Sequence, residues 1–201
     1  SSYFFFFFLW SEIMGVKEQM IGILRNSDTA RINFNYSSGQ VSTRITSDVF
    51  RRVASWLESG HFHVVEGRFS QNRVVYSAWD DASTGDAANT FYLGRNERGS
   101  RDFDALIVHE AVHAYFDLVR FSIPWVDNEA AAYIAQGFYL RNSGYPSSRM
   151  EAGEPYRVGY LIADTIANGV DASSMIADLR SNLLTDTRYS HYIRATFQGD
   201  G

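Results

Sequence analysis

Two histidines flank a glutamate in the segment His109-Glu110-Ala111-Val112-His113, an HExxH motif. Residues four apart lie on one face of a helix, about 6 Å apart along its axis, so His109 and His113 can bind one ion through ring nitrogens. Glu110 is rotated about 100° around the helix from His109, which excludes it from that ligand set but lets it reach a water on the metal. The motif therefore predicts a zinc-bound water that Glu110 activates as general base.

A third protein ligand is expected because a catalytic zinc site usually has three and keeps one open position. Glu129 lies sixteen residues after His113 (129 − 113), at the start of the next expected helix. The connector, residues 120–126, can span up to about 23 Å, so an antiparallel return beside His113 is feasible. Asp127 is the alternative ligand, although it could instead be a helix N-cap. We predict one Zn²⁺ per chain, bound by His109, His113 and Glu129.

Asp117 lies one helical turn after His113. Helical side chains lean toward the N-terminus, so its carboxylate could accept a hydrogen bond from the non-ligating nitrogen of His113. Such a bond would fix the tautomer of that ring. The alternative is an ordinary carboxylate at the surface or at the end of the helix.

The HExxH motif followed by Asn128-Glu129-x-x-Ala132 resembles the zincin metallopeptidases, specifically the gluzincin group that includes thermolysin-like enzymes. The resemblance covers residues 102–142. It implies an HExxH helix preceded by a twisted sheet, with His109, His113 and Glu129 as zinc ligands and Glu110 as base and proton shuttle. The chain departs from the pattern in its shorter connection to Glu129 and in Tyr133, which stands where the family has an aspartate.

The family also has a histidine or tyrosine that stabilises the oxyanion, and no motif assigns it here. We favour His191 because imidazole can donate a proton near neutral pH, although a histidine between two tyrosines can also be structural. The remaining candidates downstream of the metal helices are Tyr145, Tyr156, Tyr160, Tyr189 and Tyr192. By analogy with zincins, strand residues 90–93 could form the edge strand that binds an extended substrate.

The elements expected around this motif indicate an α+β fold of zincin type in one domain, residues 1–201. Residues 1–101 are predicted to be mixed helix and antiparallel strand, and residues 102–201 are predicted to be helical and to contain the metal site. Helices are expected at 11–25, 47–57, 102–119, 127–142, 154–168, 171–184 and 186–197. Strands are expected at 30–36, 41–45, 61–69, 73–79 and 90–93.

The composition excludes several classes of protein. The 201 residues are 45% hydrophobic with a net charge of −5, which is typical of a globular chain and gives no basic excess for nucleic acid. With no cysteine, disulfides and thiolate sites are excluded, and the compartment stays open, with a weak preference for a secreted or periplasmic protein. The apolar tract Tyr3–Trp10 is too short to span a bilayer, so no integral membrane span is expected. We interpret the tract as a buried segment or as a contact with a partner or membrane.

Together these features predict a zinc-dependent metallohydrolase that acts on a peptide or protein substrate. Two alternatives remain at this point. One is a catalytically inactive zincin-like protein used for binding or assembly. The other is a secreted effector or toxin protease of narrow specificity.

Overall fold

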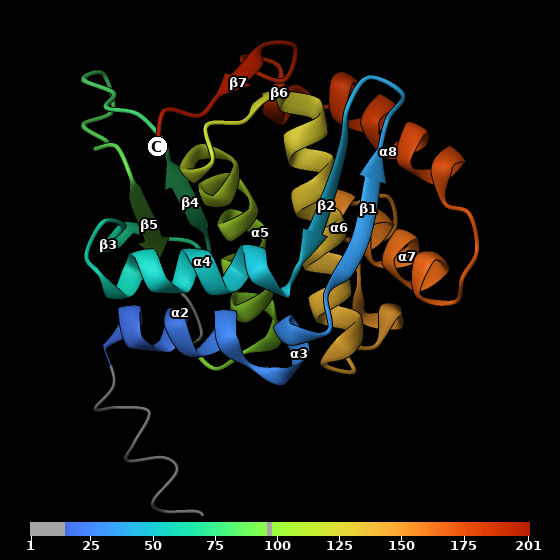
Figure 1. Ribbon diagram of the computed structural model, residues 1–201, viewed down its shortest axis with the longest axis horizontal. Coiled ribbons are helices and arrows are strands. Elements are labelled where there is room, and N and C mark those ends of the chain that lie inside the picture. Colours follow the sequence, from blue (N-terminus) through green and yellow to red (C-terminus); the bar gives the residue numbers. More distant parts are fainter. Residues whose placement is uncertain (1–14, 96–97) are drawn as a thin grey trace, which may run out of the picture.

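The computed structural model describes residues 15–95 and 98–201 and has the predicted α+β composition (Figure 1). The tract Tyr3–Trp10 lies outside the described residues. The helices are α2 (Val16–Arg25), α3 (Ser27–Ala30), α4 (Ser47–Glu58), α5 (Arg101–Leu118), α6 (Trp125–Asn142), α7 (Pro155–Ala167) and α8 (Ser173–Thr185), with short 3₁₀ turns η1 (Ser147–Arg149) and η2 (Thr187–Tyr189). The strands are β1 (Asn33–Ser37), β2 (Ser42–Thr46), β3 (His63–Phe69), β4 (Val74–Ser77), β5 (Thr90–Gly94), β6 (Ser122–Pro124) and β7 (Thr196–Gln198).

The three-stranded sheet has the order β3-β5-β4, which corrects two predictions. The strands were expected to be antiparallel, but β5 pairs parallel to β3 and antiparallel to β4. Residues 90–93 were expected at the sheet edge, but β5 lies in the centre, because the chain returns after β4 and inserts β5 between the earlier two strands. Its continuous apolar run is buried on both faces, as is typical of a central strand. The edge strand that follows β5 in this order is β4.

The C-terminal half contains strands, and the expectation of a purely helical half is wrong. Strand β6 pairs with β7 in an antiparallel ribbon. The helix expected at 186–197 is replaced by the η2 turn, further turns and β7. This segment is rich in threonine, tyrosine, serine and histidine, which are poor helix formers, and the side chain of Asp186 accepts a hydrogen bond from the main-chain nitrogen of Arg188.

Helices α5 and α6 lie side by side in the middle of the molecule and are buried on nearly all sides (Figure 1). Helix α5 packs between α6 and a layer formed by α2 and α4, while β4 also contacts it; α7 and α8 cover the other side of α6. A helix that is apolar all round must be enclosed in this way. Polar side chains on α5 and α6 are therefore held in fixed surroundings.

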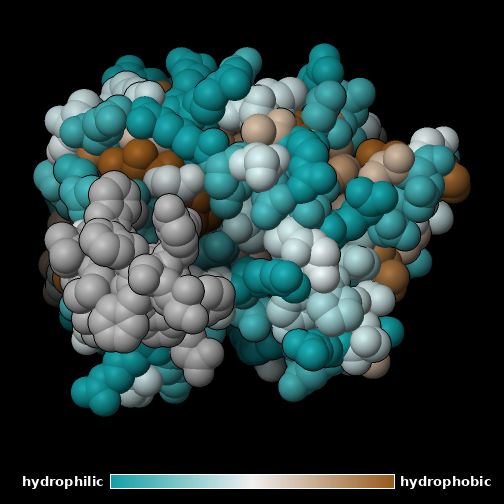
Figure 2. Space-filling view, turned by 90° about the horizontal axis from the view of Figure 1, so that it is seen from below, coloured by the Kyte–Doolittle hydropathy of each residue, from teal (hydrophilic) through white to brown (hydrophobic). Residues whose placement is uncertain are grey.

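The described surface seen from the side of α2 and α3 is mainly hydrophilic, with apolar side chains in separate patches (Figure 2). Within the described part of the chain, no helix is both long enough and apolar enough to cross a membrane.

Helices α6 and α7 approach each other at two glycines. A Cβ atom on Gly137 of α6 would lie 2.3 Å from the carbonyl carbon and oxygen of Gly159, and one on Gly159 would lie 2.2 Å from the carbonyl oxygen of Tyr133. The neighbouring atoms are backbone atoms of packed helices and cannot rotate away. Only glycine fits at either position, and the close contact fixes α6, which contributes Glu129, against α7.

We expect Gly137→Ala to lower the free energy of unfolding by about 1–3 kcal/mol, or more if the helices must separate. The matched control is Gly22→Ala on the exposed face of α2, where no atom lies within 4 Å of the added methyl group. That substitution should stabilise the protein by up to about 1 kcal/mol, because alanine has the higher helix propensity. Urea unfolding measures both, and a Gly137→Ala protein as stable as the parent would contradict the close contact.

Candidate metal centre

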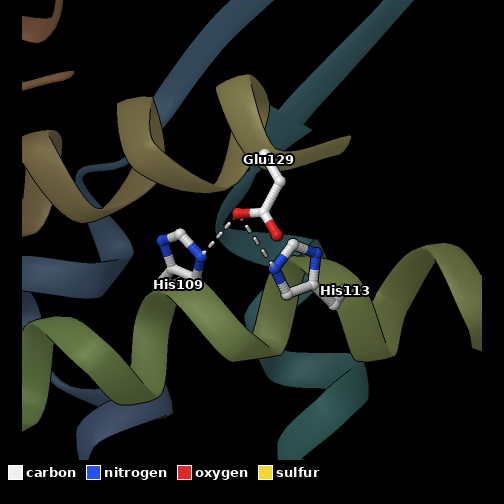
Figure 3. A group of neighbouring side chains, drawn as sticks. All are labelled: His109, His113 and Glu129. Carbon is white, nitrogen blue, oxygen red and sulfur yellow. Dashed lines mark ion pairs between the residues drawn. The ribbon is translucent and has the colours of Figure 1, made fainter. Parts of the chain in front are cut away.

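Three buried side chains converge between α5 and α6. His109 and His113 extend from α5 toward Glu129, which extends from the first turns of α6 in the opposite direction (Figure 3). The Nε2 atoms of His109 and His113 lie 3.4 and 3.8 Å from Glu129 Oε2. Each side chain has 6–7% of its surface exposed.

The donor atoms of these residues are close enough to bind one metal ion. All three lie within 4.8 Å of one another. Two ligand atoms that each lie about 2 Å from a tetrahedral ion are about 3.3 Å apart, close to the two distances measured here. The predicted convergence of His109, His113 and Glu129 is therefore confirmed.

The other ring nitrogen of each histidine has a partner on α6. His109 Nδ1 lies 3.0 Å from Gln136 Oε1, and His113 Nδ1 lies 2.7 Å from Asn128 Oδ1. Amide oxygens only accept hydrogen bonds, so each Nδ1 carries the proton. Each Nε2 atom then faces the Glu129 carboxylate.

This arrangement fits a cation. Neutral imidazole rings would present two nitrogen lone pairs to a carboxylate in this buried site, and a divalent ion between them would turn each contact into a ligand bond. The amide partners also set both rings in the orientation that such ligands need.

The partner of His113 differs from the one we expected. Asp117 does not bond to that ring; its carboxylate accepts hydrogen bonds from the Tyr76 hydroxyl at 2.5 Å and from the main-chain nitrogen of Asp200 at 2.9 Å. The hydrogen-bond partner of His113 is instead Asn128, which lies next to Glu129 on the facing helix.

Gln136 was missed by the sequence analysis. Tyr133, which stands where the motif resemblance would place an aspartate, packs its ring 4.5 Å from that of His109. Gln136 lies seven residues after Glu129, two helical turns along the same face of α6, and contacts His109 in its place. That spacing was readable from the sequence.

Asp127, the alternative ligand, is directed away from the cluster. Its carboxylate accepts hydrogen bonds from Arg180 Nε at 2.8 Å and from the Tyr36 hydroxyl at 2.6 Å. Its expected role as an N-cap is also wrong, since α6 begins at Trp125. The buried ion pair with Arg180 provides the partner that its charge requires.

Glu110 is buried beside the ligands. Its Oε2 accepts a hydrogen bond from the main-chain nitrogen of Tyr76 at 2.8 Å, so the carboxylate is held against strand β4. Burial raises the pKa of Glu110 to about 7, although His113 and the Tyr76 N–H act in the opposite direction. Burial also pushes the pKa of Glu129 upward, but the two histidines and the Tyr192 hydroxyl outweigh it and hold that pKa below its usual value.

Two of the six oxyanion candidates lie at the centre. The Tyr192 hydroxyl donates a hydrogen bond to Glu129 Oε1 at 2.8 Å. The hydroxyl of Tyr189 bonds to that of Tyr133. His191 is exposed and packs its ring 4.7 Å from that of Tyr192, so its role as a proton donor stays a prediction.

Two other candidates have partners elsewhere. The Tyr145 hydroxyl donates to Asp102 at 3.5 Å, at the other end of α5, and the Tyr156 hydroxyl accepts from the main-chain nitrogen of Glu151. Tyr160 lies half-buried on α7. Of the oxyanion candidates, the two nearest the three clustered side chains, Tyr189 and Tyr192, therefore come from the C-terminal segment that was expected to be a helix.

Comparison with known proteins gives no relative: no family model, no curated protein and no solved structure matches this chain. The functional argument therefore rests on the site itself.

Proposed function

We propose that this protein is a zinc-dependent metallohydrolase that cleaves peptide bonds. The observation that carries the proposal is the pair of Nδ1 hydrogen bonds, which leaves the Nε2 atoms of His109 and His113 aimed at Glu129. Glu110, a buried glutamate, follows His109 directly on α5.

The donor set favours zinc. Two imidazole nitrogens and one carboxylate oxygen are the ligands of many catalytic zinc sites, whereas magnesium and calcium prefer all-oxygen sites. Three protein ligands would leave the fourth position open for a reactant.

When bound, zinc supplies a Lewis acid that polarises a carbonyl group and lowers the pKa of water to about 7. Glu110 accepts the proton of the attacking water and later donates it to the leaving amine. The Tyr76 N–H orients the Glu110 carboxylate, and the Tyr192 hydroxyl orients Glu129. These residues perform the proton transfers and hold the ligand geometry.

The position of β4 supports a peptide as the substrate. Among the described strands β4 pairs with β5 alone, and its Tyr76 N–H points from the opposite edge to Glu110. An extended peptide can pair with the main chain of such an edge strand, which would place it beside Glu110. Strand β4 is thus our candidate for the edge strand that binds an extended substrate, in place of residues 90–93.

One observation favours the non-catalytic alternative. The ligand side chains are 6–7% exposed, and structural metal sites are closed whereas catalytic sites keep an open position. Hydrolysis of a peptide mixture by the zinc-loaded protein, beside a Glu110→Gln variant, separates the two functions. We expect cleavage by the parent alone; a closed structural site would give cleavage by neither.

The hydrogen bond between Gln136 and His109 gives a further prediction. We expect Gln136→Ala to lower the affinity for zinc about 10–100-fold, since His109 would lose the partner that fixes its ring and tautomer. Competition with a chromophoric chelator measures the dissociation constant. Gln19→Ala, on α2, is the matched control and should bind zinc like the parent. Equal affinities in the two variants would show that Gln136 does not orient the ligand.

A further inference from the structure

A pocket of about 550 Å³ opens on the side of α5 that faces α4. One exposed face of α4, the end of β2 and the ring of Tyr115 on α5 line it. The lining residues with charged or aromatic side chains are Arg44, Asp48, Arg51, Arg52, Trp56 and Tyr115. Its volume is in the range of pockets that bind small molecules, about 300–1,000 Å³.

The pocket concentrates positive charge on a chain whose net charge is −5. Arg51 forms an ion pair with Asp48, the one carboxylate of the lining. Arg44 donates to the neutral oxygen of Asn33 Oδ1 at 3.2 Å. Arg52 lies over the ring of Tyr115, 5.9 Å from its centroid.

Two guanidinium groups of the lining therefore have no anionic partner within the described part of the chain. Among residues 15–95 and 98–201, no carboxylate forms an ion pair with Arg44 or Arg52. Arginine binds oxyanions such as phosphate through two parallel N–H groups, an arrangement that the ammonium group of lysine does not offer. The lining thus favours a phosphate group.

The pocket lining also contains an aromatic ring and an apolar side chain. Trp56 is half-buried, and its ring packs edge-on against that of His61 with 3.8 Å between centroids. Buried Val49 lies beside it in the lining. A pocket lined by both an aromatic ring and guanidinium groups is suited to a ligand that joins a flat ring to an anion.

The pocket is separate from the metal centre. Tyr115 is two residues after His113, about 200° around the helix, so it faces α4 whereas His113 faces α6. A ligand in the pocket therefore does not contact the zinc ligands.

We propose that this pocket binds a small phosphate monoester attached to an aromatic ring. Arg44 and Arg52 bind the phosphate, and Trp56 contacts the ring. This site is independent of the proposed hydrolase activity, and its occupancy does not require zinc.

Isothermal titration of the full chain with phenyl phosphate, AMP and inorganic phosphate tests the proposal. We expect phenyl phosphate to bind with a dissociation constant below about 1 mM and about fivefold or more tighter than inorganic phosphate. Tighter binding of AMP would identify a nucleotide-sized ligand, and weaker binding of AMP would identify a smaller ring. Equal affinities for phenyl phosphate and inorganic phosphate would contradict the contact with Trp56.

Variants locate the site. Arg44→Gln combined with Arg52→Gln should weaken binding of phenyl phosphate about tenfold or more, and the exposed positions of both residues keep the fold intact. Asp48→Asn should tighten binding about twofold to fivefold, since it removes the one carboxylate of the lining, whose charge repels the phosphate. Arg68→Gln, which removes an arginine that is paired with Asp86 and lies outside the pocket lining, is the control and should leave the affinity unchanged.

The proposal fails if none of the three probes binds the parent at about 5 mM, or if the double variant binds phenyl phosphate as tightly as the parent. Titrations repeated with zinc and with a chelator should give the same affinity. Binding that requires zinc would place the phosphate at the metal centre and overturn the proposal.

Discussion

Glu110→Gln should abolish nearly all peptide hydrolysis while leaving the zinc site and the fold intact. The substitution removes the group that accepts and returns the proton, and general acid–base catalysis alone contributes about 10²–10⁴-fold to the rate. The amide oxygen of glutamine can still accept the hydrogen bond from the Tyr76 N–H that now holds the carboxylate. We therefore expect the catalytic rate constant to fall by at least about 10²-fold, with little change in stability.

The measurement is turnover of a peptide identified from a cleaved mixture, together with the zinc content of the same samples. Glu18→Gln, on the exposed side of α2, makes the same chemical change away from the site and should keep full activity. If Glu110→Gln retained the activity of the parent, Glu110 would not be the base. If neither protein cleaved any peptide while both bound zinc, the metal would be structural.

His113→Ala should remove the response of the protein to zinc. In the parent, zinc at a hundred times its dissociation constant should stabilise the fold by about 2.7 kcal/mol, which raises the Tm of a chain this size by about 5–10 °C. The variant loses one of three ligands. Its affinity for zinc should therefore fall by more than the roughly 10–100-fold that is lost when only the hydrogen-bond partner of a ligand is removed. Its Tm should then be unaffected by the same concentration of zinc.

His63→Ala is the matched control because His63 is exposed on β3 and lies outside the metal cluster. Thermal unfolding with and without zinc, followed by circular dichroism, compares the three proteins. A zinc-dependent rise in Tm that persists in His113→Ala but disappears in His63→Ala would place the metal elsewhere.

The parts of the site that lie within one helix could be predicted from the sequence. The spacing of His109 and His113 fixes their common face, and the expected bounds of α5, 102–119, agree with Arg101–Leu118 within one residue at each end. Glu129 could be predicted because the connector is short and a charge at the edge of an apolar helix needs a partner. That zinc occupies the site stays a prediction.

Contacts between elements could not be predicted in the same way. Asp117 is within reach of His113 by helical spacing, but the crossing of α5 and α6 gives that ring to Asn128 and gives the ring of His109 to Gln136. The order of the sheet likewise depends on where the chain returns after β4, which local alternation of apolar residues does not encode.

The prediction of a helix at residues 186–197 was wrong for a different reason. Asp186 looks like an N-cap, and it does cap a turn, but the η2 turn ends at Tyr189. Pairing of Thr196–Gln198 with Ser122–Pro124 then outweighs the weak helix propensity of the residues between. Tyr192 was among the oxyanion candidates, but its contact with Glu129 could not be predicted, because that contact requires the segment to fold back over α6.

The metal content of the purified chain tests the central claim most directly. After loading with zinc and gel filtration, mass spectrometry of the eluted protein should give about one zinc per chain in the parent and far less in His113→Ala. A parent that retains no zinc after loading would contradict the assignment of His109, His113 and Glu129 as ligands, and with it the proposed hydrolase.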